Sequence, residues 1–190
     1  FDAYLYYRQL SDNTASVLAD LDLAPGAYCL ATVHREENTD DPGRLQAILS
    51  ALRDIGTAAK PVLFPVHPRT RKKISQFQLA ESSDGHLRLI DPVGYRDMIV
   101  LESNAFAIFT DSGGVQKEAF FGGIPCITLR YETEWVETVA SGWNRLAGAD
   151  KASILEAFAE ATTLQNQPAP RLYGDGRAAE KIVEELMPHG

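Results

Sequence analysis

The sequence has no apolar run near the roughly 20 residues that a membrane-spanning helix needs. Positive charge is also scarce, because 18 lysines and arginines stand against 26 aspartates and glutamates, for a formal net charge of −8. A nucleic-acid partner needs a basic face, so we expect neither a nucleic acid nor a membrane as partner. A phosphate ligand is compatible with this charge, since charges beyond about 8 Å are largely screened at physiological salt.

Cysteine is rare as well, with two in the chain. Cys29 and Cys126 each lie inside a short apolar run, which favours buried thiols over a disulfide. Reduced thiols are typical of a reducing compartment. We therefore expect a cytoplasmic protein.

Several ligand-binding motifs are missing. The chain has no G-x-x-x-x-G-K-[ST] phosphate loop, which argues against a P-loop ATPase. No G-x-G-x-x-G follows the first expected strand, which weakens a nicotinamide interpretation. The segment Thr110–Gly114 lacks the leading glycine of a hydrolase nucleophile elbow. The histidines and cysteines do not have zinc spacing, and we expect neither a metal nor a cofactor.

The sequence does contain a regular alternation of buried strands and helices. With 190 residues, 45% of them hydrophobic, one sizeable core is expected. The expected strands are the apolar runs Tyr28–Val33, Pro61–Val66, Leu87–Ile90, Ala105–Thr110, Cys126–Leu129 and, at an edge, Trp143–Leu146. Helices are expected over Tyr4–Leu21, Pro42–Gly56, Arg71–Leu79, Arg96–Ser103, Gly113–Phe121, Ala152–Thr163 and Gly176–Leu186, with Arg130–Glu137 as a loop or helix start. This order predicts an α/β fold with a Rossmann-like, doubly wound parallel sheet.

The stretch Ala105–Pro125 organises the rest of the chain. An apolar strand passes through Asp111-Ser112-Gly113-Gly114 into a helix that ends at Gly122-Gly123. Such a junction places free N–H groups and the positive end of a helix dipole at the carboxyl edge of a sheet, which is an anion site. Ser112 can cap the helix or donate to a ligand, and the absence of Cβ atoms on Gly113 and Gly114 lets a phosphate approach the backbone.

Glu118 makes this expected site more specific. It lies six residues beyond Ser112, which is roughly 9 Å along a helix axis and close to the span from a pyrophosphate to its ribose. A carboxylate there can accept both ribose hydroxyls, as an acidic residue does in dinucleotide folds. A Ser-Gly-Gly on its own has a plainer interpretation than a ligand site, namely a helix N-cap followed by a solvated glutamate. The strand, Ser-Gly-Gly and Glu118 together favour a nucleotide diphosphate.

Polar and basic residues also follow the other expected strands. They are His34 and Arg35 after the first strand, His67 and Arg69 after the second, Tyr95 and Met98 after the third, and Arg130–Glu137 after the fifth. Ligands of such sheets bind beyond the carboxyl ends of the strands, so these residues are candidates for one shared site. Each also has a plainer explanation, since His34 can cap a helix, Arg69 can be a solvated charge and Met98 can belong to the core.

Five motifs carry a resemblance to a known family. They are, in order, His34-Arg35-Glu36-Glu37-Asn38, His67-Pro68-Arg69, Asp91-Pro92 with Tyr95, Thr110–Glu118 (TDSGGVQKE) and Tyr173-Gly174-Asp175-Gly176. Together, over essentially the whole chain, they resemble the C-terminal domain of the non-hydrolysing UDP-N-acetylglucosamine 2-epimerases. The resemblance implies one half of a GT-B-type fold, in which two Rossmann-like domains enclose the active site.

The resemblance also implies roles for these residues. UDP would bind largely to this half, with its diphosphate on Ser112, Gly113 and Gly114 and its ribose on Glu118. Tyr95 and Met98 would flank uracil, and His34 would approach the diphosphate and the sugar as an assisting proton carrier. Arg35, His67 and Arg69 would complete the UDP-binding set. The implied reaction interconverts UDP-GlcNAc and UDP-ManNAc by elimination of UDP to a glycal and re-addition of UDP on the other face.

Two positions depart from the family pattern. Met98 stands where many members have an aromatic residue against the base; it can still cover a ring face but stacks differently. Thr133-Glu134-Trp135 stands where many members have Thr-Glu-Arg, so one cationic contact is expected to be missing. The two departures leave open whether the substrate is a modified UDP-sugar.

The resemblance divides the chain into an interdomain connecting helix, residues 1–22, and a UDP-binding domain, residues 23–190. The proposed catalytic carboxylates of the family belong to an N-terminal domain, which we expect to be absent from this chain, and a full-length homodimer is implied. Three other functions stay open: a GT-B glycosyltransferase donor domain, a hydrolysing epimerase that releases free ManNAc, and a non-catalytic module that senses UDP-sugars.

Overall fold

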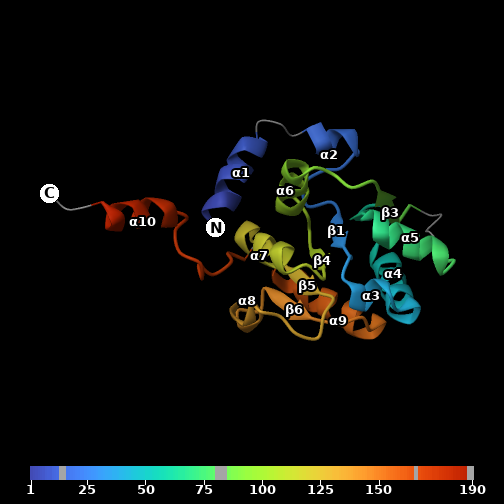
Figure 1. Ribbon diagram of the computed structural model, residues 1–190. Helices are drawn as coiled ribbons and strands as arrows, with labels where there is room; N and C mark the ends of the chain where they lie inside the picture. The colour runs from blue at the N-terminus through green and yellow to red at the C-terminus, as the bar shows by residue number, and fades with distance from the viewer. Residues whose placement is uncertain (13–15, 80–84, 165–166, 188–190) are drawn as a thin grey trace.

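The computed structural model describes residues 1–12, 16–79, 85–164 and 167–187. At their centre lies a six-stranded sheet with the strand order β3-β2-β1-β4-β5-β6 (Figure 1). The strands are β1 (Cys29–Thr32), β2 (Val62–Pro65), β3 (Leu87–Ile90), β4 (Ile108–Thr110), β5 (Cys126–Thr128) and β6 (Asn144–Leu146). All neighbouring strands run parallel. The predicted Rossmann-like parallel sheet is therefore confirmed, with β4 in its centre.

Helices cover both faces of this sheet. They are α1 (Asp2–Asp12), α2 (Ser16–Asp20), α3 (Glu36–Thr39), α4 (Pro42–Ile55), α5 (Pro68–Gln76), α6 (Tyr95–Ser103), α7 (Gly113–Gly122), α8 (Val136–Ala140), α9 (Lys151–Ala161) and α10 (Ala178–Leu186), with a 3-10 turn at Thr162–Leu164. One hydrophobic core lies between the sheet and α4, α5 and α9. A second lies between the sheet and α2, α6 and α7.

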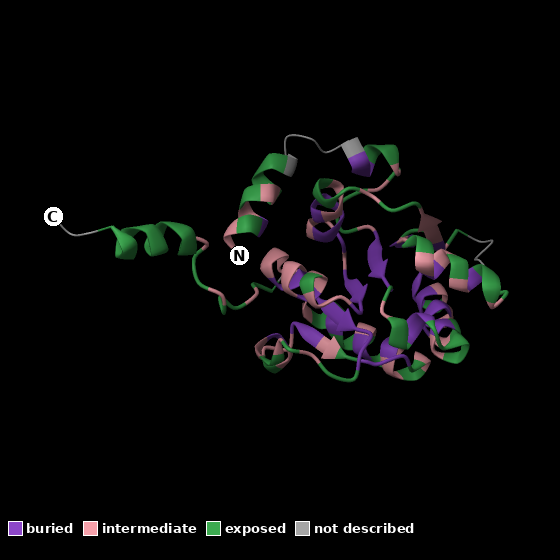
Figure 2. Cartoon of the chain, in the orientation of Figure 1, coloured by how far each residue is buried: buried purple, intermediate pink, exposed green. Residues whose placement is uncertain are grey.

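The inner strands β2, β1, β4 and β5 are buried because they are largely apolar on both faces, whereas the edge strands β3 and β6 are partly exposed (Figure 2). In β1, Cys29 and Ala31 belong to the core under α4, and Leu30 belongs to the core under α6. Parallel strands enclosed by helices on both sides require this composition. Cys29 and Cys126 are buried free thiols, as predicted, and burial raises the pKa of each to about 12.

Two helices differ most from their predicted bounds. In place of the single helix expected over Tyr4–Leu21, the structure has two helices, α1 and α2, and both pack against α6. Residues 13–15 of the expected helix lie outside the described ranges. Helix α5 begins at Pro68, three residues before the predicted Arg71. The reason is local, because the His67 Nδ1 atom accepts a hydrogen bond from the Arg69 N–H at 3.3 Å and Pro68 occupies the first helical position.

The C-terminal helix α10 extends away from the sheet (Figure 1). Its residues are exposed, including the apolar side chains of Ile182, Val183 and Leu186. Near its start, the Ala179 N–H donates to Asp2 at 2.9 Å, which joins α10 to α1. No helix within the described ranges is long and apolar enough to cross a membrane.

Candidate functional site

The candidate site begins where β1 and β4 end side by side. The strand order reverses between these two strands, and this is where open α/β sheets bind ligands. The hydroxyl oxygens of Thr32 and Thr110, paired in register, lie 2.6 Å apart and hold the two strand ends together. The residues after β1 and those after β4 therefore share one edge of the sheet.

Asp111 is the fully buried anchor of this edge. Its carboxylate accepts hydrogen bonds from the backbone N–H of His34 at 3.1 Å and from that of Arg35 at 3.0 Å. The His34 ring lies within 3.3 Å as well, through Nδ1. Asp111 thus fixes the turn that carries both candidate residues. The sequence indicates only a turn at Asp111, because its partners His34 and Arg35 lie 77 and 76 positions away.

Asn38 connects this anchor to β5. Its buried amide donates to Asp111 at 3.0 Å and to the carbonyl of Leu129 at 3.0 Å. Its carbonyl oxygen accepts from the Arg44 guanidinium at 2.9 Å. These contacts explain the short helix α3, which the sequence did not predict, and they tie the ends of β1, β4 and β5 into one unit.

The junction between β4 and α7 has the geometry of an anion site. Ser112 is the N-cap residue, its hydroxyl accepts from the Val115 N–H at 3.4 Å, and α7 begins at Gly113 as predicted. Gly114 is exposed, and the nearest atom to a Cβ placed there would be the Ser112 hydroxyl at 3.8 Å. The first turn of α7 therefore presents backbone N–H groups and a positive helix end to solvent.

The loop after β5 packs beside this helix end, against Gly113. The indole N–H of Trp135 donates to the carbonyl of Gly113 at 2.8 Å. Glu134 lies beside the same glycine and forms two hydrogen bonds with the guanidinium of Arg130, at 3.0 and 3.2 Å. The departure from the family pattern at position 135 thus lies against the candidate anion site, with a carboxylate next to it.

A hydrogen-bonded network under α7 holds that loop in place. The side-chain oxygen of Gln116 accepts from the Thr133 hydroxyl at 2.6 Å and from the Asn144 amide at 3.2 Å. On the outer side, the Lys117 ammonium lies 4.1 Å from the centre of the Trp135 ring and 4.6 Å from that of Tyr173. Tyr173, from the Tyr-Gly-Asp-Gly motif, is thereby brought against α7.

Glu118 meets Tyr95 rather than open solvent. The Tyr95 hydroxyl donates to Glu118 Oε1 at 2.8 Å, while half of the Tyr95 residue stays exposed. Loss of solvation and the neighbouring Glu118 carboxylate raise the pKa of Tyr95. Met98, one turn further along α6, is partly buried and packs against the core. The structure therefore joins two candidate residues, Tyr95 and Glu118, whose contact the sequence did not indicate.

His67 and Arg69 form a neighbouring group after β2. His67 caps α5, and Arg69 pairs with Glu36 at 2.6 Å and with Asp40 at 2.8 Å. The two ion pairs of Arg69 connect α5 to α3 and the residue after it, and they raise the pKa of the Arg69 guanidinium. This group adjoins the Asp111 cluster, because Glu36 directly follows Arg35. Within the described ranges, His67 and Arg69 form no hydrogen bond or ion pair with Ser112 or Glu118.

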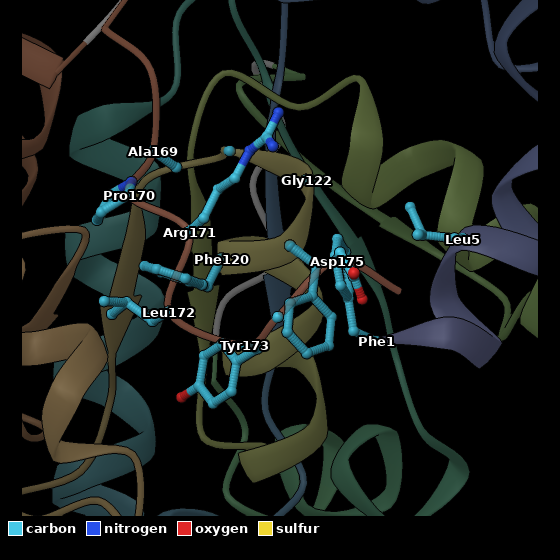
Figure 3. Close-up of a pocket in the computed structure, with 13 residues that line it drawn as sticks. Phe1, Leu5, Phe120, Gly122, Ala169, Pro170, Arg171, Leu172, Tyr173 and Asp175 are labelled. Atoms are coloured by element: carbon cyan, nitrogen blue, oxygen red, sulfur yellow. The ribbon is translucent and has the colours of Figure 1, made fainter. Parts of the chain in front are cut away.

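A cavity of about 380 Å³ lies at the other end of α7 (Figure 3). Its walls include Phe1, Phe120, Tyr173 and the backbone of Gly122-Gly123, with Arg171 along one side. Gly122 is ten residues from Ser112, or roughly 15 Å along the helix. This cavity is therefore separate from the candidate anion site.

Comparison with known proteins decides the family. The family model for UDP-N-acetylglucosamine 2-epimerase matches residues 1–187. The chain belongs to the UDP-N-acetylglucosamine 2-epimerase family. Among relatives, a UDP-N-acetylglucosamine 2-epimerase homolog from Methanococcus maripaludis is 47% identical over 94% of this chain and 50% of its own length. The UDP-2,3-diacetamido-2,3-dideoxy-D-glucuronate 2-epimerase of Pseudomonas aeruginosa is 44% identical over 97% of this chain and 50% of its own length.

A solved 2-epimerase also superposes on this fold. The Methanocaldococcus jannaschii UDP-GlcNAc 2-epimerase, in complex with UDP-GlcNAc and UDP, gives a TM-score of 0.85 at 36% identity. The match covers 97% of this chain and 52% of that structure. The chain thus spans about half the length of the 2-epimerases that it matches.

Proposed function

We propose that the protein containing this chain interconverts UDP-GlcNAc and UDP-ManNAc, with this chain as its UDP-binding half. The supporting observation is the unit of β4, Ser112–Gly114 and α7, which offers N–H groups at a positive helix end, with Glu118 six residues further on. A diphosphate and a ribose have the right chemistry and separation for these two positions.

Each candidate residue has a role in this proposal. Ser112, Gly113 and Gly114 bind the diphosphate, and Glu118 accepts the ribose hydroxyls. His34, held at Asp111, approaches the diphosphate and the sugar, and Arg35 adds positive charge nearby. Tyr95, which contacts Glu118, and Met98, one turn further along α6, flank the base. His67 and Arg69 complete the basic rim.

The reaction divides between two tasks. A base removes the proton from C2 of the sugar; the C–H electrons form the C1–C2 double bond, and the bond from C1 to the diphosphate oxygen breaks. UDP then adds back to C1, while a proton returns to the opposite face of C2. The helix end and its N–H groups stabilise the negative charge that develops on the leaving diphosphate. The base would come from a carboxylate of a second half that completes the GT-B-type cleft.

We further propose that the whole protein is a cytoplasmic homodimer. The buried free thiols of Cys29 and Cys126 support a reducing compartment. Analytical ultracentrifugation of the full-length protein tests the dimer. A sedimentation coefficient of a monomer over the micromolar range would contradict it.

The test of the activity follows UDP-GlcNAc in deuterated water by NMR. We expect the full-length protein to incorporate deuterium at C2 and to form UDP-ManNAc. The 190-residue chain alone should bind UDP in calorimetry and exchange nothing, because proton removal needs a base within hydrogen-bond reach of C2. Exchange at an enzymatic rate by the chain alone would place the base within it. Release of free ManNAc would indicate a hydrolysing enzyme, and transfer of the sugar to an added acceptor would indicate a glycosyltransferase.

A second substrate has support of its own. The Pseudomonas relative named for UDP-2,3-diacetamido-2,3-dideoxy-D-glucuronate is 44% identical to this chain, and both Met98 and Trp135 depart from the common pattern. The same NMR assay with that sugar nucleotide decides between the two, through the ratio of kcat/KM values.

A further inference from the structure

An anionic side chain already lies at the candidate anion site. The Glu134 Oε2 atom is 3.7 Å from the point where a Cβ on Gly113 would stand. Gly113 is the first residue of α7, so this carboxylate lies at the positive end of the helix. Its side chain is 56% exposed, and a ligand can therefore reach it and displace it.

The partner of Glu134 is a cation suited to phosphate. Arg130 donates through both terminal nitrogens to the two carboxylate oxygens, at 3.0 and 3.2 Å. A planar guanidinium binds a carboxylate and a phosphate with the same paired geometry. The Arg130 side chain is 6% exposed, and Glu37 lies 3.7 Å from its Nε atom. Besides Glu134, Arg130 therefore has a second carboxylate nearby, while its buried Nε atom has no hydrogen-bond partner among the described residues.

The location of Arg130 fits a role at the same edge. It directly follows Leu129, whose N–H donates to the Thr110 carbonyl at 2.8 Å, so it emerges beside the end of β4. Within the segment Arg130–Trp135 it is the one basic residue in the sequence. The hydrogen bonds from Arg130 lower the pKa of Glu134 to about 2, so the glutamate is an anion at neutral pH.

We propose that Arg130 is a diphosphate-binding residue and that Glu134 is an internal anion that occupies the diphosphate position until the nucleotide arrives. This inference rests on the proposed function, because it takes the ligand to be a nucleoside diphosphate. On binding, the diphosphate takes the place of the Glu134 carboxylate both on Arg130 and at the end of α7. The exchange keeps Arg130 paired throughout, which avoids a buried guanidinium without a counterion.

The proposal and a purely structural role of the Arg130–Glu134 pair predict different changes in UDP affinity when Glu134 is neutralised. If Glu134 competes with the diphosphate, its neutralisation strengthens UDP binding. If Glu134 only holds Arg130 in place, the same change weakens binding or leaves it unaltered. Uridine, which has no phosphate, separates an effect at the diphosphate position from a change elsewhere in the site.

The experiment is titration calorimetry of the chain and its variants with UDP and with uridine. We expect Glu134→Gln to bind UDP about fivefold more tightly, because UDP no longer has to break an ion pair whose carboxylate is exposed. The same variant should bind uridine with the affinity of the wild type. The matched control is Glu156→Gln, which removes the same charge from an exposed position on α9 and should change neither affinity.

A second variant tests the cation. We expect Arg130→Lys to weaken UDP binding about tenfold, because one ammonium cannot form the paired contact, and to leave uridine binding unaltered. Circular dichroism melts check that both variants are folded. Equal or weaker UDP binding by Glu134→Gln overturns the exchange, and a uridine effect as large as the UDP effect does so too. Absence of UDP binding by the wild type would instead overturn the proposed function.

Discussion

Two buried acidic residues, Asp111 and Glu102, have opposite surroundings. Asp111, at the end of β4, is fully buried and accepts from two backbone N–H groups and one amide. Glu102, on α6, is 1% exposed, and neither of its oxygens has a hydrogen-bond partner among the described residues. Burial first, and then the nearby Glu118, raise the pKa of Glu102 well above its usual range.

The comparison shows what makes a buried carboxylate useful for a site. The buried carboxylate of Asp111 fixes the position of the segment after β1, because each donor that it binds belongs to that segment. Glu102 positions no other group by hydrogen bonding among the described residues. Because burial and the Glu118 charge raise its pKa, we expect its contribution to stability to depend on pH. The diphosphate side of the candidate site is therefore built on a hydrogen-bonded carboxylate, whereas Glu118, on the ribose side, has near it a buried carboxylate whose pKa is raised.

Removal of Asp111 should have the largest effect. Asp111→Ala removes the acceptor of two part-buried backbone N–H groups and of the buried Asn38 amide. Each group that stays unpaired costs about 1–3 kcal/mol, so we expect a loss of roughly 3 kcal/mol in the free energy of unfolding. Urea unfolding measures it. Asp111→Asn keeps one carbonyl acceptor and should lose less. A loss below about 1 kcal/mol for the alanine variant would show that water replaces the carboxylate.

Glu118→Ala should come next, and its effect is on binding. If Glu118 accepts both ribose hydroxyls, each lost charge-assisted hydrogen bond costs roughly 1.5–3 kcal/mol, or about tenfold or more in UDP affinity. Calorimetry with UDP and 2′-deoxy-UDP tests this, because the variant should lose less for the deoxy ligand. Equal losses for the two ligands would mean that Glu118 does not contact the 2′-hydroxyl.

Glu102→Gln should change the pH dependence of stability. The folded-state pKa of Glu102 lies above its unfolded value of about 4.3. The stability from its neutral form is therefore complete below that value and is lost as pH rises through the folded-state pKa. We expect Tm of the wild type to fall relative to Glu102→Gln between pH 5 and pH 8. A tenfold change in proton affinity is worth about 1.4 kcal/mol, and each 1 kcal/mol moves Tm by about 2–4 °C at this chain length.

The matched control for that measurement is Glu156→Gln. Glu156 lies on the exposed side of α9, so its replacement should leave the pH profile parallel to that of the wild type. If the profiles of the wild type and Glu102→Gln were also parallel, Glu102 would be ionised in the folded protein over this range, and the contrast with Asp111 would disappear.

The smallest effect is expected for Tyr95→Phe. The Tyr95 hydroxyl now occupies Glu118 Oε1, which a ribose hydroxyl would need. Its removal should therefore strengthen UDP binding by roughly threefold, the worth of one exposed hydrogen bond. Calorimetry gives the sign. Phenylalanine keeps the ring that is proposed to flank uracil, so weaker binding would show that the Tyr95 hydroxyl itself donates to the nucleotide.

The fold was predictable because its signals are local. Apolar runs such as Ala105–Thr110 specify buried parallel strands, and the Pro42 and Ser112 starts of α4 and α7 follow from capping chemistry that a few neighbouring residues contain. The candidate anion site follows from the same kind of signal, since one strand, one turn and one helix build it.

Contacts between distant segments were not predictable in this way. Asp111 and His34 are 77 positions apart, and no local pattern connects them. The same holds for Tyr95 with Glu118, for Asn38 with Leu129, and for the approach of Glu134 to Gly113. Each of these contacts depends on which strands and helices are neighbours in the fold. The periodicity of the sequence predicts where strands occur, but it does not predict which strands lie side by side.

The strand order has a consequence for synthesis of the chain on the ribosome. Strand β1 pairs with β2 on one side, but its other neighbour is β4, and the paired Thr32 and Thr110 are 78 positions apart. At about 5–20 residues per second, β4 follows β1 out of the ribosome by roughly 4–16 s. During that interval the nascent β1 has one open hydrogen-bonding edge on an apolar strand, which is a template for unwanted pairing. Slower elongation lengthens this exposure, so the yield of folded protein should depend on how quickly residues 33–110 are translated.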